Sequence, residues 1–216
     1  MRSDVRITKF THSCLRLEDG GAVLVVDPGG FSERSALTGA DAVLVTHEHA
    51  DHLDVEALQE ATAARPDLRI YAHDDVLPKL AAVGERVTAV EAGQRFEAAG
   101  FTVRAYGGQH AIIYPEIPRI ANLGYLIADA QTNVYTPGDS FTVPDGEQVD
   151  TVFVPLNAPW MKLAEAIDFV RAVRPARAYA LHDALLTETG AAISDGHLER
   201  FGGTRYAHLA PGTVID

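Results

Sequence analysis

A cluster of imidazole and carboxylate side chains directly after a short apolar run constrains this chain more than any other feature. The run Ala42-Val43-Leu44-Val45 leads into Thr46-His47-Glu48-His49-Ala50-Asp51-His52, where three imidazoles and the Asp51 carboxylate fall within six positions. Zinc and similar ions need lone-pair donors that converge at about 2.0–2.2 Å, and neutral His nitrogens and Asp oxygens suit them. The fold must therefore leave room for a metal centre around this segment.

The spacing within the cluster suggests two positions for a ligand. His47 and His49 are two residues apart and can point the same way from an extended or turning backbone. Asp51 and His52 are adjacent, so their side chains diverge and suit a second position beside the first. A helical pattern starting near Asp54 leaves the cluster on a strand-to-helix loop. A polar loop with incidental histidines is the alternative, and for an interior segment we favour the metal centre.

Partners for this cluster should lie elsewhere, because four ligands in one loop rarely complete a pair of catalytic metal sites. His110, Asp139 and His182 each come shortly after a strand-like run. Active sites in open α/β sheets gather at the carboxyl ends of strands. Each residue is ambiguous alone, since a single His often caps a strand and Pro-Gly-Asp is an ordinary turn signal. Together with the cluster they indicate one site.

Short apolar runs separated by Gly, Pro and Asp predict an α/β protein, which begins with a β-meander and continues by alternating strands and helices. No linker divides residues 1–216, so we expect one domain. Residues 107–122 form the longest irregular stretch, which we interpret either as a substrate-facing lid or as a surface excursion. The expected strands are 5–10, 22–27, 42–46, 69–72, 101–106, 124–128, 133–136, 151–155 and 178–181, and the expected helices are 55–64, 75–83, 163–173 and about 194–201.

Four motifs taken together resemble the metallo-β-lactamase superfamily of hydrolases, over nearly the whole chain. They are Thr46-His47-Glu48-His49-Ala50-Asp51-His52, Gly107-Gly108-Gln109-His110, Pro137-Gly138-Asp139-Ser140 and His182, with Val25-Val26-Asp27-Pro28-Gly29 upstream. Within that superfamily the chain looks most similar to the ascorbate-6-phosphate lactonase-like group. The stretches behind this closer likeness are 11–15, 122–127 and 155–161, although Asn157-Ala158 stands where that group usually has two glycines.

The resemblance implies a four-layer αβ/βα sandwich and a dinuclear metal site. It also implies hydrolysis of an ester, lactone or phosphoester of a small molecule by a hydroxide that bridges two divalent cations, with zinc as our first choice and manganese or iron as alternatives. Asp51 would be both a ligand and a catalytic proton acceptor or relay. One metal would be held by His47, His49 and His110, the other by Asp51, His52 and His182, with Asp139 bridging them.

Four further residues are candidates for substrate contact or for support of the ligands. His12 follows the first strand and either faces the metals or is a core or capping residue. Asp27 either orients a ligand His through its carboxylate or simply forms a turn. Asn157 and Trp160 lie in a loop after a strand and could bind substrate, and Trp160 could equally be a buried anchor.

Charge and composition limit the partners. The chain has 18 Lys and Arg against 30 Asp and Glu, a formal net charge of −12, which argues against nucleic acid and anionic membrane surfaces. The first residues show no apolar signal core, and Cys14 is the single cysteine, so we expect a cytoplasmic protein without an intrachain disulfide. A small-molecule substrate is expected, and a homo-oligomer is left open.

Two alternative functions remain on the same scaffold. A phosphodiesterase or nuclease would want a basic groove or an added nucleic-acid-binding arm, which the net charge disfavours. An iron-dependent, oxygen-using enzyme is the other alternative, because His and Asp ligands serve iron as well as zinc. A non-catalytic metal-binding protein would be expected to have lost ligands, whereas all seven expected positions are filled.

Overall fold

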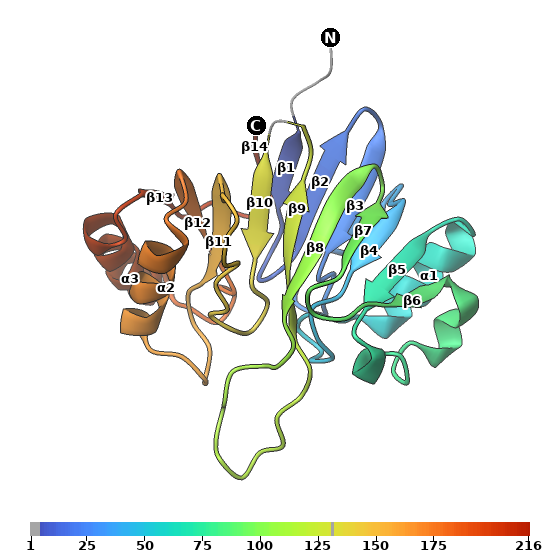
Figure 1. The fold of residues 1–216 in the computed structure, drawn as a ribbon, viewed down its shortest axis with the longest axis horizontal. Helices are drawn as coiled ribbons and strands as arrows, with labels where there is room; N and C mark the ends of the chain where they lie inside the picture. The colour runs from blue at the N-terminus through green and yellow to red at the C-terminus, as the bar shows by residue number, and fades with distance from the viewer. Residues whose placement is uncertain (1–4, 131) are drawn as a thin grey trace.

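Two seven-stranded sheets form the body of the protein in a computed structural model that describes residues 5–130 and 132–216. Residues 1–4 lie outside the described residues. The expectation about a signal segment rests partly on them. The sheets pack face to face, with helices on the two outer sides (Figure 1). Within the described residues, none of the helices combines the length and the apolarity that crossing a bilayer requires.

The first sheet starts as an antiparallel meander and continues as a parallel sheet. The first three strands pair in antiparallel fashion, which confirms the predicted meander, and the pairing from the third strand to the edge is parallel. In spatial order its strands are β14 (Thr213–Ile215), β1 (Arg6–Lys9), β2 (Leu15–Asp19), β3 (Ala22–Val26), β4 (Ala42–Leu44), β5 (Arg69–Ala72) and β6 (Val87–Ala89).

The second sheet repeats this arrangement without a repeat in the sequence. Its first four strands along the chain are antiparallel, and the following pairs are parallel. In spatial order its strands are β13 (Arg205–Ala207), β12 (Arg177–Leu181), β11 (Thr151–Pro155), β10 (Asn133–Thr136), β9 (Leu123–Ala128), β8 (Phe101–Gly107) and β7 (Arg95–Ala98).

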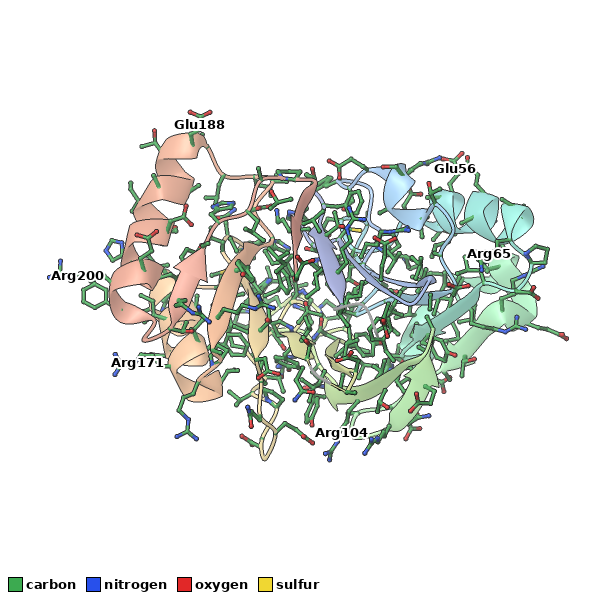
Figure 2. The ribbon with its side chains drawn as sticks, turned by 90° about the horizontal axis from the view of Figure 1, so that it is seen from above. Glu56, Arg65, Arg104, Arg171, Glu188 and Arg200 are labelled. Carbon is green, nitrogen blue, oxygen red and sulfur yellow. The ribbon has the colours of Figure 1, made fainter. Side chains whose placement is uncertain are left out.

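Helices cover the outer faces of both sheets and complete the αβ/βα sandwich that was predicted. Helix α1 (Val55–Ala64) packs on the first sheet, whereas α2 (Leu163–Val173) and α3 (Glu188–Phe201) lie on the second. Figure 2 shows Glu56 and Arg65 on one outer side of the molecule and Arg171, Glu188 and Arg200 on the opposite side. The charged residues of the helices thus face solvent and the apolar ones face the sheets.

Apolar positions explain these elements. In α2, the buried residues Ala166, Phe169, Val170 and Val173 recur at three- and four-residue spacing, so they form one stripe against the second sheet. The Asp54 carboxylate caps α1 by accepting from the Ala57 amide, 3.0 Å away. Between the sheets lies a third apolar layer, to which Phe153 and Tyr125 contribute fully buried side chains.

Some local predictions were wrong. Residues 75–83 do not form an α-helix but two 3₁₀ segments, η2 (Asp74–Val76) and η3 (Ala81–Arg86), because Pro78 has no amide hydrogen to continue a helix. Helix α3 begins at Glu188, earlier than expected, behind the N-cap Thr187. A further 3₁₀ segment, η1 (Arg34–Leu37), lies before β4. The strands β6, β7, β13 and β14 were missed because they are short edge strands with many exposed residues.

The strands that precede the candidate site residues end at one edge of the sandwich. Strands β3 and β4 are parallel neighbours, as are β10, β11 and β12, and β8 runs the same way as β10 because both are antiparallel to β9. The Leu123 amide donates to the Thr46 carbonyl at 2.9 Å, which joins the two sheets at this edge. The loop between β8 and β9 projects from the same edge, at the bottom of Figure 1.

Candidate metal centre

The structure brings together all seven side chains that the sequence assigned to metal binding, although they come from four separate loops. They fall into two groups of four, and the possible ligand atoms within each group lie within 4.8 Å of one another. One group is His47, His49, His110 and Asp139, and the other is His12, Asp51, His52 and His182. The cluster divides between the groups as its spacing predicted, and His12 joins the second one.

In the first group, hydrogen bonds fix which nitrogen is free on two of the three rings, those of His47 and His110. The Thr46 hydroxyl donates to Asp27 Oδ2 at 2.7 Å, so it accepts from His47 Nδ1–H at 2.9 Å. His47 Nε2 is then left with its lone pair, 3.1 Å from His49 Nδ1. His110 donates from Nδ1 to the Ala111 carbonyl at 2.6 Å, which leaves its Nε2 lone pair facing the other rings.

The second group is built in the same way. His52 donates from Nδ1 to Asp27 Oδ2 at 2.8 Å, and His182 donates from Nδ1 to the Asn157 carbonyl at 2.6 Å. Their Nε2 atoms lie 3.1 and 3.4 Å from Asp139 Oδ1, and His182 Nε2 lies 3.3 Å from Asp51 Oδ2. Asp139 reaches both groups, because its other oxygen lies 3.3 Å from His110 Nε2.

Three buried polar atoms of the described residues have no hydrogen-bond partner, and all three are in this centre. They are His110 Nε2, His182 Nε2 and Asp139 Oδ1. Leaving such atoms unsatisfied costs about 1–3 kcal/mol each, so native proteins rarely tolerate it without a ligand. Two ligands around a tetrahedral ion at about 2.0–2.1 Å lie about 3.3 Å apart, close to the distances of 3.1–3.4 Å found here. The residues therefore fit divalent cations.

His12 is oriented differently from the other rings. The Ala184 amide donates to His12 Nδ1 at 3.3 Å, so a neutral His12 carries its proton on Nε2 and donates it to Asp51 Oδ2 at 3.0 Å. The ring is fully buried. Of the two alternatives open from the sequence, His12 thus faces the centre, and its geometry favours support of the Asp51 carboxylate over direct metal binding.

The other supporting candidates also lie at the centre. The Trp160 indole donates from Nε1 to Asp139 Oδ2 at 2.8 Å, which connects this residue to the carboxylate shared by both groups. Asn157 contributes its backbone carbonyl to His182, not its side chain. Asp27 accepts from the Thr46 amide at 2.8 Å, in addition to the bonds from the Thr46 hydroxyl and His52 described above.

Two residues that sequence analysis did not select, Thr46 and Asn122, help to hold the candidate metal ligands in place. Thr46 connects Asp27 to His47 by relaying hydrogen bonds, as described above. Asn122 is fully buried, accepts from the Asp139 amide at 2.9 Å and donates to the Pro137 carbonyl at 2.9 Å. Gly138, between Pro137 and Asp139, has φ +61°, and a Cβ there would lie 2.3 Å from Asn122 Oδ1. The Pro-Gly-Asp turn was visible in the sequence, whereas nothing local identified Asn122 as its partner.

Burial and charge set the protonation of the centre. Burial lowers the pKa of His47 and of His49, which keeps both rings neutral. Burial alone would also lower the pKa of His52, but the carboxylates of Asp139 and Asp27 outweigh it and raise that pKa well above its usual value. For His182, burial is likewise outweighed by the nearby carboxylates of Asp139 and Asp51, whose oxygens lie 3.4 and 3.3 Å from Nε2, and the pKa is raised to about 9. Cations entering the centre would displace these protons, so metal affinity should fall as pH drops.

The chain is similar to proteins with a β-lactamase-type domain. The family model described as a beta-lactamase superfamily domain matches residues 6–182. Protein Rv0786c of Mycobacterium tuberculosis is 43% identical over 98% of this chain and 99% of its own length. A UPF0173 metal-dependent hydrolase of Myxococcus xanthus is 27% identical, over 71% of this chain and 59% of its own length.

Solved structures share the fold. Igni18, a metallo hydrolase from Ignicoccus hospitalis, superposes with a TM-score of 0.77 at 18% identity and covers 98% of this chain and 97% of its own. CmlA, a diiron β-hydroxylase from Streptomyces venezuelae, gives a TM-score of 0.74 at 16% identity and covers 99% of this chain, which corresponds to 54% of CmlA.

Proposed function

This chain belongs to the beta-lactamase superfamily, whose family model matches residues 6–182, and we propose that it is a metal-dependent hydrolase whose centre holds two divalent cations and cleaves an ester, lactone or phosphoester bond of a small molecule. The observation that carries the proposal is the convergence of His110 Nε2, His182 Nε2 and Asp139 Oδ1, which are buried and unpartnered. Each of the two rings has its other nitrogen committed to a backbone carbonyl. The two lone pairs thus face the two oxygens of the Asp139 carboxylate.

The proposed division of ligands follows the two groups. His47, His49 and His110 would hold one cation, and Asp51, His52 and His182 the other, with Asp139 shared. When bound, such a pair supplies a water that ionises near neutral pH and a Lewis acid for a carbonyl or phosphoryl oxygen. Zinc is our first choice, and manganese or iron would fit the same His and Asp donors.

The chain's own residues would position these ligands and move a proton. Asp51 is the proposed proton acceptor or relay, and with 23% of its side chain exposed it is the more accessible of the two carboxylates at the centre. His12 Nε2–H would hold Asp51 Oδ2 in place. Trp160 and Asp27 would orient Asp139 and His52 respectively through the hydrogen bonds described above.

Metal analysis of protein purified without chelators is the direct test. We expect about two equivalents of a divalent metal in the parent, fewer in His49→Ala, and parent content in His197→Ala, a matched control on the exposed face of α3. Parent-level metal in His49→Ala would overturn the assignment of the centre. A panel of lactones, phosphodiesters and thioesters, with His49→Ala as the blank, then identifies the bond that is cleaved.

An oxygen-using iron enzyme is the second candidate. The similarity to the diiron β-hydroxylase CmlA favours it, together with a donor set that suits iron. Iron as the purified metal, with oxygen consumption on adding a reductant and no hydrolysis across the panel, would replace the hydrolase proposal by this one.

A further inference from the structure

The loop between β8 and β9 carries a group of apolar side chains that pack poorly against the rest of the protein. Its base is a two-stranded extension of the hairpin, with His110 N donating to the Ile120 carbonyl at 3.0 Å and Gly108 N to the Asn122 carbonyl at 2.9 Å. Beyond it the chain leaves the body of the molecule (Figure 1). Ile112, Tyr114 and Ile117, which we call the apolar tip, are 60%, 56% and 50% exposed.

Exposed large hydrophobic side chains concentrate around the metal centre. Eight occur among the described residues, and five of them lie on loops that carry or contact its residues. Besides the apolar tip they are Phe31, whose ring centroid lies 5.2 Å from that of His12, and Leu185, three residues after His182. Large exposed apolar patches on soluble proteins mark binding sites. Here the exposed apolar side chains lie on loops that adjoin the centre.

A cavity of about 450 Å³ lies between the loop and the centre. Its volume falls within the range of about 300–1,000 Å³ that accommodates small molecules. Residues 110–120 line it, and His49 closes it together with His110 at the end next to the metal centre. A molecule whose reacting bond reaches these two rings must therefore place part of its body against the loop.

The charge of the cavity does not suit a strongly anionic group. Apart from the two histidines, its charged residues are one acid, Glu116, and one base, Arg119. Arg119 is committed to the base of the loop, where it donates to the His110 carbonyl and, at 2.8 Å, to Gln109 Oε1. The rest of the cavity lining consists mainly of Ile, Pro and Tyr side chains. Contact between these side chains and an apolar group removes apolar surface from water and is therefore favourable.

We propose that the cavity under the apolar tip holds an alkyl, acyl or aryl portion of the substrate, so that the enzyme prefers esters or lactones with an apolar body over phosphorylated or short polar ones. This inference rests on the proposed hydrolytic function of the adjacent centre. Residues of the loop then contribute to specificity by contact with the substrate, whereas the bond that is cleaved is set at the metals.

A series of n-alkyl hydroxamic acids tests this without turnover, because the hydroxamate head group chelates the metal and only the tail changes. Binding of acetohydroxamic to octanohydroxamic acid to the zinc-loaded protein is measured by calorimetry. Burying one methylene fully contributes about 0.8 kcal/mol, a factor of about four, and the open cavity should yield about half of that free energy. We therefore expect about a twofold gain per methylene, or about sixtyfold over the series.

Two variants assign the gain to the loop. In the triple variant Ile112→Ser, Tyr114→Ser, Ile117→Ser, the ratio of octano- to acetohydroxamic affinity should fall to within about threefold of one. The matched control, Ile193→Ser with Phe201→Ser, removes exposed apolar side chains of α3 and should keep the parent ratio. Thermal unfolding verifies that both variants are folded.

The outcomes separate the two proposals. A flat chain-length series in the parent, with binding that is lost in His49→Ala, would overturn the apolar cavity and leave the metal centre standing. Binding that survives in His49→Ala would overturn the centre, and the inference with it. A steep series that the triple variant does not change would place the tail elsewhere and also overturn the inference.

Discussion

Replacing Asp27 by Asn changes the group behind His52 with almost no change in volume. In the parent, the Asp27 carboxylate accepts three hydrogen bonds, from the Thr46 amide at 2.8 Å, the Thr46 hydroxyl at 2.7 Å and His52 Nδ1 at 2.8 Å. The Asn side chain can keep its oxygen facing the backbone N–H of Thr46 only if its NH₂ group faces the Thr46 hydroxyl and His52 Nδ1. Both of those groups are donors in the parent, so one or both must rearrange.

The consequence for His52 is a change of tautomer. Facing an NH₂ group, its Nδ1 becomes an acceptor and the proton moves to Nε2, the atom that lies 3.1 Å from Asp139 Oδ1 and that we propose as a metal ligand. Loss of such supporting hydrogen bonds costs ten- to a hundredfold in metal affinity, or about 1.4–2.7 kcal/mol. We expect a loss in this range for one of the two ions.

The assay is competition for zinc with a chromophoric chelator at constant pH. A matched control is Asp41→Asn, because the Asp41 carboxylate also accepts from a backbone amide, that of Val23 at 2.8 Å, but belongs to neither group of possible ligands. The control should bind zinc like the parent. Parent affinity for both ions in Asp27→Asn would show that Asp27 does not set the tautomer of His52, and the reasoning would fail.

Three further predictions follow from the structure. Trp160→Phe removes a hydrogen bond to the shared carboxylate, worth about 1.5–3 kcal/mol because its acceptor is charged, and calorimetry should show about ten- to a hundredfold weaker zinc binding; unchanged affinity would refute a supporting role. His208 lies between Asp183 and Asp195, and its hydrogen bond to Asp183 above all raises its pKa. Its contribution to stability is therefore complete below about pH 6.5 and is lost as pH rises through the raised pKa, so the destabilisation by His208→Gln in urea titrations should shrink from pH 6 to pH 9 and not grow. Phe153→Ala empties part of the layer between the sheets and should lower the free energy of unfolding by about 3–5 kcal/mol in the same assay, whereas a loss below 1 kcal/mol would contradict its full burial.

The fold and the position of the site could both be predicted from the sequence, because both depend on where the strands lie and where they end. Runs such as 22–26 and 152–155 are apolar throughout, which is typical of strands buried on both faces, and these lie in β3 and β11. Parallel strands end at the same edge of a sheet, so donors placed after separate strands must approach one another. His110, Asp139 and His182 were found by this rule, with no information about long-range contacts.

The support of the ligands could not be predicted in the same way. Whether Trp160 donates to a ligand or fills the core depends on the direction of one side chain, and its sequence neighbours do not determine that direction. The relay from His47 through Thr46 to Asp27 joins β4 to β3 and depends on their register. The helix expected at 75–83 does not form, for a local reason that was visible in the sequence. Pro78, in the middle of this range, has no amide hydrogen to donate to a helical hydrogen bond.

Backbone strain at the centre shows most clearly why local patterns are insufficient. His12, Asp27 and His182 have φ values of +64°, +47° and +55°, in a region that side-chain-bearing residues rarely adopt. Each such residue costs about 1–3 kcal/mol and persists only where its surroundings hold it. Here the His182 amide donates to the His12 carbonyl at 3.1 Å, and Thr46 holds Asp27 with two hydrogen bonds, so each strained residue is fixed by a loop distant in sequence. Glycine would relieve the strain at any of the three positions but would remove the imidazole or carboxylate that the centre uses, so we interpret the strain as the cost of placing these side chains at the edge where the strands end.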